Sequence, residues 1–386
     1  MRIILNGISL ISSGGMVSAK NLVKSLTVLD EKNSYLLLFP EGSGYEEISL
    51  PSNFEIMLFR RKKFNDIYRL YLDNSFFPRI AKKWKADVFF TLCNLGPIKL
   101  DIPHLVMVRK PYFVYDESYL YNNWSLTGKL NLKFQKKIMN RVLKNSTAVT
   151  VQTDVMKTRI MESFNLSNDK VSIIPNALME ENLVINNNIT EFPYDYLKQE
   201  SKVNLLALAQ YYPHKNLEII IEVAEELLSR KIKNFKFILT VDESHHSNVK
   251  FLLEEIKKRD LQNYITNVGV VKPNDLQNLY KVSDYLFMPT VLETFGNPYV
   301  EAMYNKIPIF TSDLDFARYM CRDAAIYFNP FNPREIADKI SKEILEANKQ
   351  QNEMRIEKGI EIVEEKFISW ETIAQNYLDL LYSISK

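Results

Sequence analysis

The sequence predicts an α/β fold made of two doubly wound, Rossmann-like halves. Short apolar runs typical of fully buried strands alternate with helical patterns in residues 3–174 and again in residues 203–328. A polar, asparagine-rich stretch, residues 179–202, separates the two series. The chain has 386 residues, of which 46% are hydrophobic and 25% charged, so each half is long enough to bury its own core.

The first half opens with an apolar run, residues 3–5, followed by a loop and a helical pattern. A strand, a loop containing Gly14 and Gly15, and a helix form the start of a Rossmann-like unit. The fingerprint Gly-x-Gly-x-x-Gly is absent, so dinucleotide binding is disfavoured. Later strands of this half are expected at residues 35–39, 54–58, 86–91, 104–108, 146–153 and 170–177.

The second half repeats the alternation. Its helix over residues 217–228 has apolar side chains on one side, and a terminal helix after Trp370 presents Ile373 and Tyr377 on one face. Strands are expected at residues 203–209, 235–241, 265–271, 282–288, 307–311 and 325–328.

The loop after the fourth expected strand of the second half carries the most specific chemistry. Gly296 permits close approach of the backbone, and Pro298 suits the first position of the helix that follows. The free amides of Phe295, Gly296 and the residues after Pro298 are then expected to point out of a helix N-terminus, which binds phosphate. Glu293 and Glu301 flank this point, and carboxylates accept hydrogen bonds from sugar hydroxyls.

The pattern Glu-x-Phe-Gly-x-Pro…Glu-Ala, from Glu293 to Ala302, resembles the donor-sugar motif of retaining nucleotide-sugar glycosyltransferases of the glycosyl transferases group 1 family, glycosyltransferase family 4. The resemblance runs from residue 1 to about residue 380 and implies the GT-B fold, two Rossmann-like domains facing across a cleft. The implied parts are an acceptor-binding domain at 1–178, a linker at 179–202, a nucleotide-sugar-binding domain at 203–366, and a helix at 367–386 that crosses back to the first domain.

The resemblance also assigns donor-binding roles. It implies that Lys215 binds the diphosphate, Glu293 the donor-sugar hydroxyls and Glu301 the ribose hydroxyls. The loop with Val270 and Val271 is implied to lie beside the base. Backbone groups facing sugar and phosphate would come from Thr294, Phe295, Gly296, Asn297 and Pro298.

The first half is implied to contribute Gly14 and Gly15, which face the donor phosphates or the acceptor. Two positions depart from the family pattern. Arg109 stands where many members have a histidine; it can clamp a phosphate but cannot shuttle a proton as histidine does. Gln210 replaces an arginine five positions before the diphosphate lysine, so one cation is missing there. His104 is expected at the beginning of its strand, at the wrong end of the sheet.

The predicted catalytic side chains are therefore Glu293, Lys215 and Arg109. The resembled family retains the configuration of the sugar without an agreed protein nucleophile, and front-face attack by the acceptor hydroxyl is the usual proposal, so no nucleophile is assigned. Positive groups around the leaving diphosphate are expected to supply most of the rate. No cofactor is expected beyond the nucleotide diphospho-sugar, which is a substrate.

No metal site is predicted. Asp313 and Asp315 form an Asp-x-Asp motif, which holds a divalent cation in a different glycosyltransferase fold, but here it follows a strand of the second half. His245 and His246 lack a third ligand nearby and are expected in an exposed turn.

The charge is distributed unevenly. Residues 1–178 contain 25 Lys plus Arg against 15 Asp plus Glu, whereas the remainder contains 24 against 32. In residues 129–144, lysines and arginines interleave with apolar residues. Such a surface can rest on an anionic membrane, receive a polyphosphate acceptor, or be a solvated helix face. We expect a cytoplasmic protein that can contact the inner face of the cell membrane and does not bind nucleic acid.

These observations favour a retaining glycosyltransferase that extends a bacterial cell-surface polysaccharide on a lipid-linked glycan acceptor. Two alternatives remain open at this stage. One is another enzyme on the same fold, such as a nucleotide-sugar epimerase or a disaccharide synthase with a soluble acceptor. The other is a non-catalytic nucleotide-sugar binder, which the replacements at Gln210 and Arg109 would support.

Overall fold

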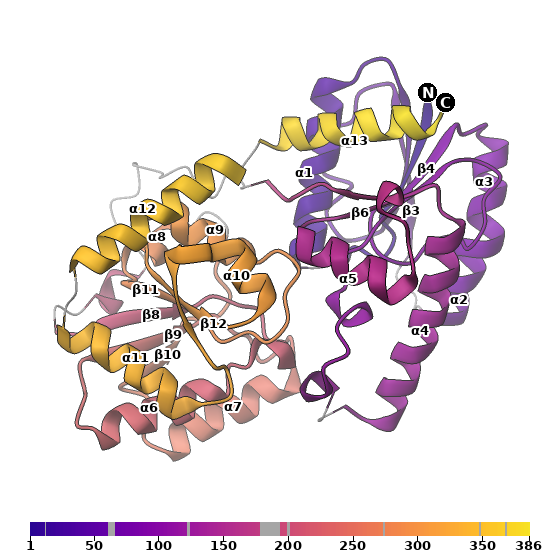
Figure 1. Cartoon of the computed structure of the whole chain (residues 1–386). Coiled ribbons are helices and arrows are strands. Elements are labelled where there is room, and N and C mark those ends of the chain that lie inside the picture. The colour runs from indigo at the N-terminus through magenta and orange to yellow at the C-terminus, as the bar shows by residue number, and fades with distance from the viewer. Residues whose placement is uncertain are drawn as a thin grey trace. The chain divides into compact units, whose positions relative to one another are not determined.

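The structure is a computed structural model that describes residues 1–11, 13–60, 66–121, 124–177, 194–198, 201–272, 275–346, 349–366 and 369–386. The chain forms two compact units, Met1–Ala177 with Ile368–Lys386, and Leu178–Phe367. Each unit is built on one parallel sheet with helices against it (Figure 1). The predicted class of two Rossmann-like units is confirmed. Most of the predicted linker lies outside the described residues.

In the first unit, the described residues form a sheet of seven strands in the order β3-β2-β1-β4-β5-β6-β7. The first strand lies inside the sheet, because Ile4 pairs with Leu36 on one side and Phe89 on the other. The strand order therefore reverses between β1 and β4. The strands are β1 Arg2–Asn6, β2 Ser34–Pro40, β3 Phe54–Phe59, β4 Val88–Thr91, β5 His104–Met107, β6 Ala148–Val151 and β7 Val171–Ile173.

Helices cover both faces of this sheet. Side chains alternate along β1, so that Ile3 and Leu5 join one apolar cluster and Ile4 joins another. The first cluster includes Leu26 of α1 and Tyr377 of α13, so the C-terminal helix packs on the first unit as predicted (Figure 1). The α-helices are α1 Ser13–Leu29, α2 Asp66–Tyr71, α3 Phe77–Lys83, α4 Leu126–Asn145, α5 Asp154–Phe164 and α13 Trp370–Ile384. A π-helix, Leu72–Phe76, joins α2 to α3, and short 3₁₀ turns occur at Pro111–Phe113, Ser118–Tyr121 and Asn168–Lys170.

In the second unit, the described residues form six strands in the order β10-β9-β8-β11-β12-β13, and the order reverses between β8 and β11. The strands are β8 Val203–Ala207, β9 Phe235–Leu239, β10 Ile265–Asn267, β11 Tyr285–Met288, β12 Ile309–Ser312 and β13 Ala325–Phe328. The helices are α6 Ile219–Ser229, α7 Ser247–Lys258, α8 Leu276–Lys281, α9 Asn297–Tyr304, α10 Asp315–Cys321, α11 Pro333–Glu346 and α12 Lys349–Lys366, with 3₁₀ turns at Asp195–Leu197, Pro213–Lys215 and Arg322–Ala324. Phe237, Phe287 and Phe310 fill the core beneath α6 and α11.

Candidate functional site

The site in the second unit lies where its strand order reverses. The strands β8 and β11 are parallel neighbours, so the loops that follow them leave the same edge of the sheet. Open parallel sheets bind ligands at this position. The loop after β8 ends in the turn Pro213–Lys215, and the loop after β11 leads into α9.

These two loops bring together the predicted residues Lys215 and Glu293. The Lys215 Nζ donates to Glu293 Oε2 at 2.6 Å, and the two side chains are 16% and 17% exposed. The pair is thus sheltered but reachable from solvent. An ammonium held in this way can bind a phosphate. The Glu293 carboxylate can accept a further hydrogen bond, for example from a sugar hydroxyl.

Backbone and side-chain hydrogen bonds fix Lys215 in place. The carbonyl of His214 accepts from the Val291 amide at 2.8 Å and from the Thr290 hydroxyl at 3.1 Å. On the other side of the lysine, Asn216 has a left-handed backbone with φ 54°. Its Nδ2 donates to the carbonyls of Pro330 at 2.8 Å and Pro289 at 3.3 Å. Sequence reasoning missed this clamp, although asparagine is one of the few residues that tolerate this backbone conformation.

The charges of the site support a stable ion pair. Burial alone would raise the pKa of Glu293, but the Lys215 ammonium and the Thr294 amide together hold that pKa below its ordinary value. The amide of Thr294 donates to Glu293 Oε1 at 3.1 Å. Burial, with the adjacent Lys215 charge, lowers the pKa of His214 to about 3. His214 is therefore neutral near pH 7, and Lys215 is the cation available to an anionic ligand.

Gly296 precedes α9 in a conformation that favours glycine. Its φ is 78°, and a Cβ placed there would lie 2.5 Å from Cδ2 of Tyr299. The Tyr299 ring cannot easily move, because its hydroxyl is hydrogen-bonded to Thr311 at 2.7 Å. Two details of the prediction were wrong. Pro298 is the second residue of α9, not the first, and the Tyr299 amide donates to the Gly296 carbonyl, so this amide is not free for a ligand.

The remaining predicted donor residues of the second unit lie in the loops after β8, β10 and β11 or in α9. Glu301 is 8% exposed and its Oε2 accepts from the buried Tyr280 hydroxyl at 2.9 Å, a partner that sequence reasoning missed. Its role toward ribose stays a prediction. Val270 is exposed and Val271 half-buried after β10, and Gln210 is half-buried after β8.

The residues predicted in the first unit belong to its own sheet and helices. Arg109 follows β5, and its Nε donates to Met107 Sδ at 2.7 Å. The predicted glycine loop was wrong: Gly14 and Gly15 lie in the first turn of α1. Glycine can adopt the helical conformation, and α1 already begins at Ser13. His104 is the first residue of β5, as predicted. Burial lowers its pKa to about 3.

The Asp-x-Asp motif has an ordinary structural partner. Both oxygens of Asp313 accept from Arg318, at 2.6 and 2.8 Å. Across the residues that the structure describes, no group of three or more His, Cys, Asp or Glu side chains could hold a metal ion.

Comparisons with known proteins agree with this fold. Residues 188–360 match the family model described as glycosyl transferases group 1. The O-antigen chain mannosyltransferase RfbU of Salmonella typhimurium is 24% identical over 218 residues, which cover 56% of this chain and 56% of that protein. The match thus spans little more than half of that curated relative.

Two solved structures resemble the whole chain. Sucrose-phosphate synthase from Thermosynechococcus elongatus has a TM-score of 0.78 at 14% identity and covers 100% of this chain and 99% of that one. HepE from Anabaena, in complex with UDP and glucose, has a TM-score of 0.70 at 14% identity, with 99% and 100% covered. At this identity the likeness establishes the fold, which is that of GT-B glycosyltransferases.

Proposed function

We propose that this chain, which is a member of the glycosyl transferases group 1 family over residues 188–360, is a glycosyltransferase that moves a sugar from a nucleotide diphospho-sugar to a hydroxyl of a glycan acceptor. Transfer retains the configuration at the anomeric carbon. The acceptor is lipid-linked, and the product belongs to a cell-surface polysaccharide. The name of the Salmonella relative, an O-antigen chain mannosyltransferase, supports this process.

The ion pair of Lys215 and Glu293 at the reversal point of the second sheet is the observation that carries the proposal. A diphosphate that enters this edge meets the Lys215 ammonium and the turn at Gly296 before α9. Because negative charge grows on the leaving diphosphate as the sugar bond breaks, a fixed cation there stabilises the transition state more than the ground state. Glu293 orients Lys215 and accepts a hydrogen bond from a hydroxyl of the donor sugar.

The reaction needs no covalent intermediate with the protein. The acceptor oxygen forms a bond to the anomeric carbon on the face that the diphosphate leaves, and the bond from that carbon to the diphosphate oxygen breaks. The acceptor proton passes to the departing phosphate oxygen. The products are the glycoside and a nucleoside diphosphate. Lys215 supplies positive charge in place of a metal, so we propose that transfer is metal-independent.

The first unit is proposed to bind the acceptor, with Arg109 next to a phosphate of the donor or acceptor. The structure of HepE with UDP and glucose supports a nucleotide-sugar donor for this fold. A donor of this kind is made in the cytoplasm, where we place the protein. The structure contains no helix, among its described residues, long and apolar enough to cross a bilayer.

The test is release of nucleoside diphosphate from a panel of UDP- and GDP-sugars, with a lipid extract as acceptor and EDTA present. We expect Lys215→Ala to lower kcat/KM about 100-fold or more. Lys342→Ala, an exposed lysine of α11, is the control and keeps full activity. Proton NMR of the product is expected to show the donor's anomeric configuration. Equal activity of both lysine variants would contradict the assignment, and an inverted product would contradict retention.

A further inference from the structure

Helix α4, Leu126–Asn145, has a composition that its packing does not require. It carries six Lys or Arg side chains and no Asp or Glu. Its inward face needs only Leu132, Met139, Val142 and Leu143, which are buried. The remaining side chains of α4 are not needed for the core, so their charge and polarity can serve the binding of another molecule.

The outward face of the first half of α4 is apolar. Leu126, Leu130 and Phe134 are spaced four residues apart, which places them in one row along the helix. They are 79%, 64% and 48% exposed, respectively. Exposed apolar residues are ordinary when scattered singly, but a row of three along one helix marks an interaction surface.

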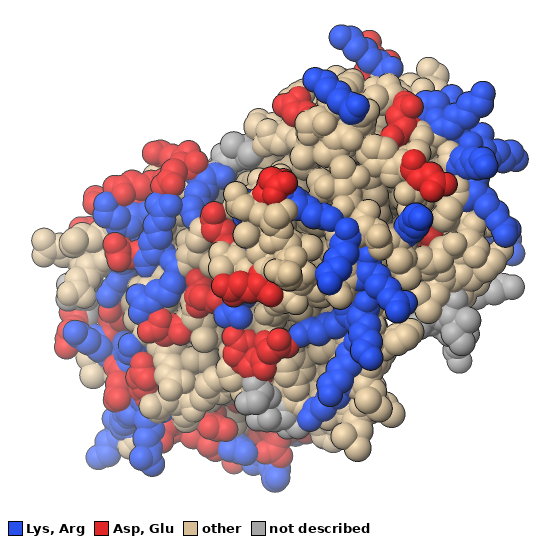
Figure 2. Space-filling model, turned by 45° about the vertical axis from the view of Figure 1, so that its right-hand side comes forward, with Lys and Arg blue, Asp and Glu red and all other residues tan. Residues whose placement is uncertain are grey.

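A row of lysines runs beside the apolar row. Lys129, Lys133 and Lys137 are also four residues apart. Each lies one position before a residue of the apolar side, namely Leu130, Phe134 and Ile138. Lys and Arg side chains form a band on the face drawn in Figure 2. Positive charge and apolar side chains are thus presented together.

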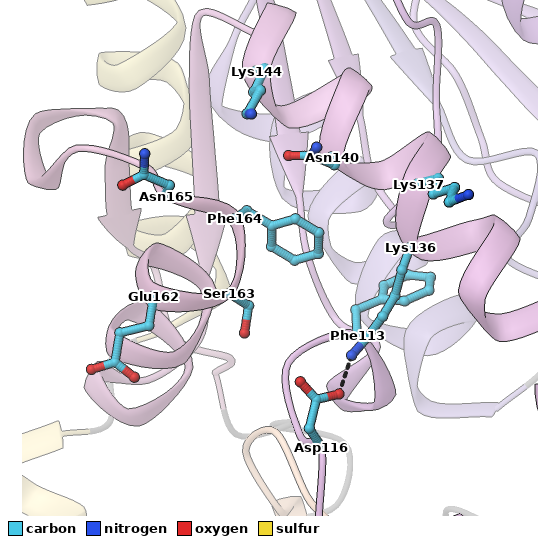
Figure 3. Close-up of a pocket in the computed structure, with 10 residues that line it drawn as sticks. All are labelled: Phe113, Asp116, Lys136, Lys137, Asn140, Lys144, Glu162, Ser163, Phe164 and Asn165. Atoms are coloured by element: carbon cyan, nitrogen blue, oxygen red, sulfur yellow. Dashed lines mark hydrogen bonds and ion pairs between the residues drawn. The ribbon is translucent and has the colours of Figure 1, made fainter.

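The second half of α4 borders a hollow of about 370 Å³. In Figure 3, Asn140 and Lys144 lie on the side of α4 that faces the end of α5, where Phe164 and Asn165 close the hollow. Lys136 pairs with Asp116 at its rim. The hollow adds the Asn140 amide and the Lys144 ammonium next to the lysine row, and the carboxylates of Asp116 and Glu162 also line it.

We propose that the outward face of α4 docks on an anionic lipid bilayer. Leu126, Leu130 and Phe134 enter the boundary between headgroups and acyl chains, while the lysine row contacts headgroup phosphates. An anionic bilayer is the occupant that fits, because a soluble polyanion would not need the apolar row and an apolar protein groove would not need the lysines. None of these docking residues is among those assigned to the sugar-transfer site.

Sedimentation of the full chain with vesicles tests the proposal. We expect strong binding to vesicles that contain phosphatidylglycerol, weak binding to pure phosphatidylcholine, and loss of binding as salt increases. Leu130→Ser with Phe134→Ser is expected to weaken binding by about tenfold or more, since both apolar groups then stay in water. Lys133→Glu is expected to weaken it about fivefold or more per charge removed.

Matched variants in the second unit serve as controls. Phe251→Ser on α7 removes a side chain that is 63% exposed, and Lys342→Glu reverses an exposed charge on α11; neither is expected to change binding. The vesicles contain no sugar acceptor, so the result does not depend on the enzymatic proposal. Because the chain has three native tryptophans, the unsubstituted protein is the baseline: Phe134→Trp should add fluorescence that brominated acyl chains quench, whereas the fluorescence that Phe251→Trp adds should not be quenched.

Two results would overturn the proposal. Binding that depends on Lys133 but is unchanged by Leu130→Ser with Phe134→Ser would mean adsorption by charge without insertion. Binding weakened equally by the α4 and control variants would mean that α4 is not the docking face. Circular dichroism of each variant verifies that loss of binding does not come from unfolding.

Discussion

The two units share one strand order but place different chemistry where that order reverses. In the first unit, Arg69 ties together the loops after β1 and β4, through Ser9 Oγ at 2.6 Å and the Leu95 carbonyl at 2.8 Å. Its Nε also pairs with the buried Asp73 at 2.6 Å. In the second unit, the loops after β8 and β11 meet through Lys215 and Glu293.

The comparison shows that the same strand reversal occurs in both sheets, whereas the side chains in the adjoining loops determine what each edge can bind. Arg69 donates to the buried Asp73, to the Leu95 carbonyl and to the Ser9 hydroxyl, and these bonds hold the edge of the first unit in place. The Lys215 and Glu293 side chains are 16% and 17% exposed, so a ligand phosphate can reach the ammonium while Glu293 keeps its pairing with it. Arg69 thus stabilises the first edge, whereas Lys215 at the second edge remains accessible, as the proposed donor site requires.

The largest expected effect is on stability at the first edge. Arg69→Ala leaves Asp73, which is 3% exposed, without its cation, and is expected to lower the free energy of unfolding by about 3–5 kcal/mol. Arg318→Ala breaks an exposed pair with Asp313 and is the control, expected to cost less than about 1 kcal/mol. Urea unfolding measures both. Similar losses would mean that the first edge is not held by its buried pair.

A pair of glycines sharpens the contrast between the edges. Gly296→Ala is expected to destabilise by about 1–3 kcal/mol, because its φ is 78° and the new Cβ would meet the Tyr299 ring. Gly14→Ala lies in a helix with nothing near its Cβ, and is expected to stabilise by about 0.5–1 kcal/mol. Thermal unfolding compares the two; the same sign for both would contradict the conformations described.

Lowering the pH should distinguish the roles of His104 and His214. The pKa of His104 and of His214 is about 3 in the folded protein, below the ordinary 6.5, so the unfolded chain binds protons that the folded chain does not. Stability is therefore full above pH 6.5 and falls as pH drops toward 3, by about 1.4 kcal/mol per pH unit for each such histidine. His104→Gln should reduce this slope and leave donor binding unchanged. His214→Gln should reduce the slope and also alter donor binding, measured by calorimetry at pH 7 and pH 5.

Asn216 is expected to have the smallest effect, and only on activity. Asn216→Gly keeps the left-handed backbone but removes the two hydrogen bonds beside Lys215, so kcat/KM should fall about fivefold to tenfold through poorer positioning. Asn165→Gly, which caps α5 of the first unit with φ 50°, is the control and should not change it. Donor-binding calorimetry and steady-state rates measure both; equal activity would show that the clamp does not position the lysine.

The sequence predicted both sheets because buried parallel strands and amphipathic helices leave strong local patterns. The family resemblance also indicated Lys215 and Glu293. Neither loop sequence predicts that these two side chains pair with each other, because they are 78 positions apart. The hydrogen bond from Tyr280 to Glu301 was missed for the same reason, as were the bonds from Arg69 to the loops after β1 and β4. Such contacts form only when elements distant in the sequence pack together. Gly14 was placed in a loop because glycine usually marks turns, whereas the helix begins one residue earlier.

Hydrogen exchange with mass spectrometry compares the two edges in a single experiment and tests the central claim most directly. A saturating concentration of a nucleotide diphospho-sugar that the chain turns over should slow amide exchange in residues 210–216 and 292–297, because these residues form the loops of the proposed donor site. Residues 7–11 and 92–96, at the corresponding edge of the first unit, should change less. Protection confined to the first unit's loops, with the Gly296 turn unchanged, would contradict the account.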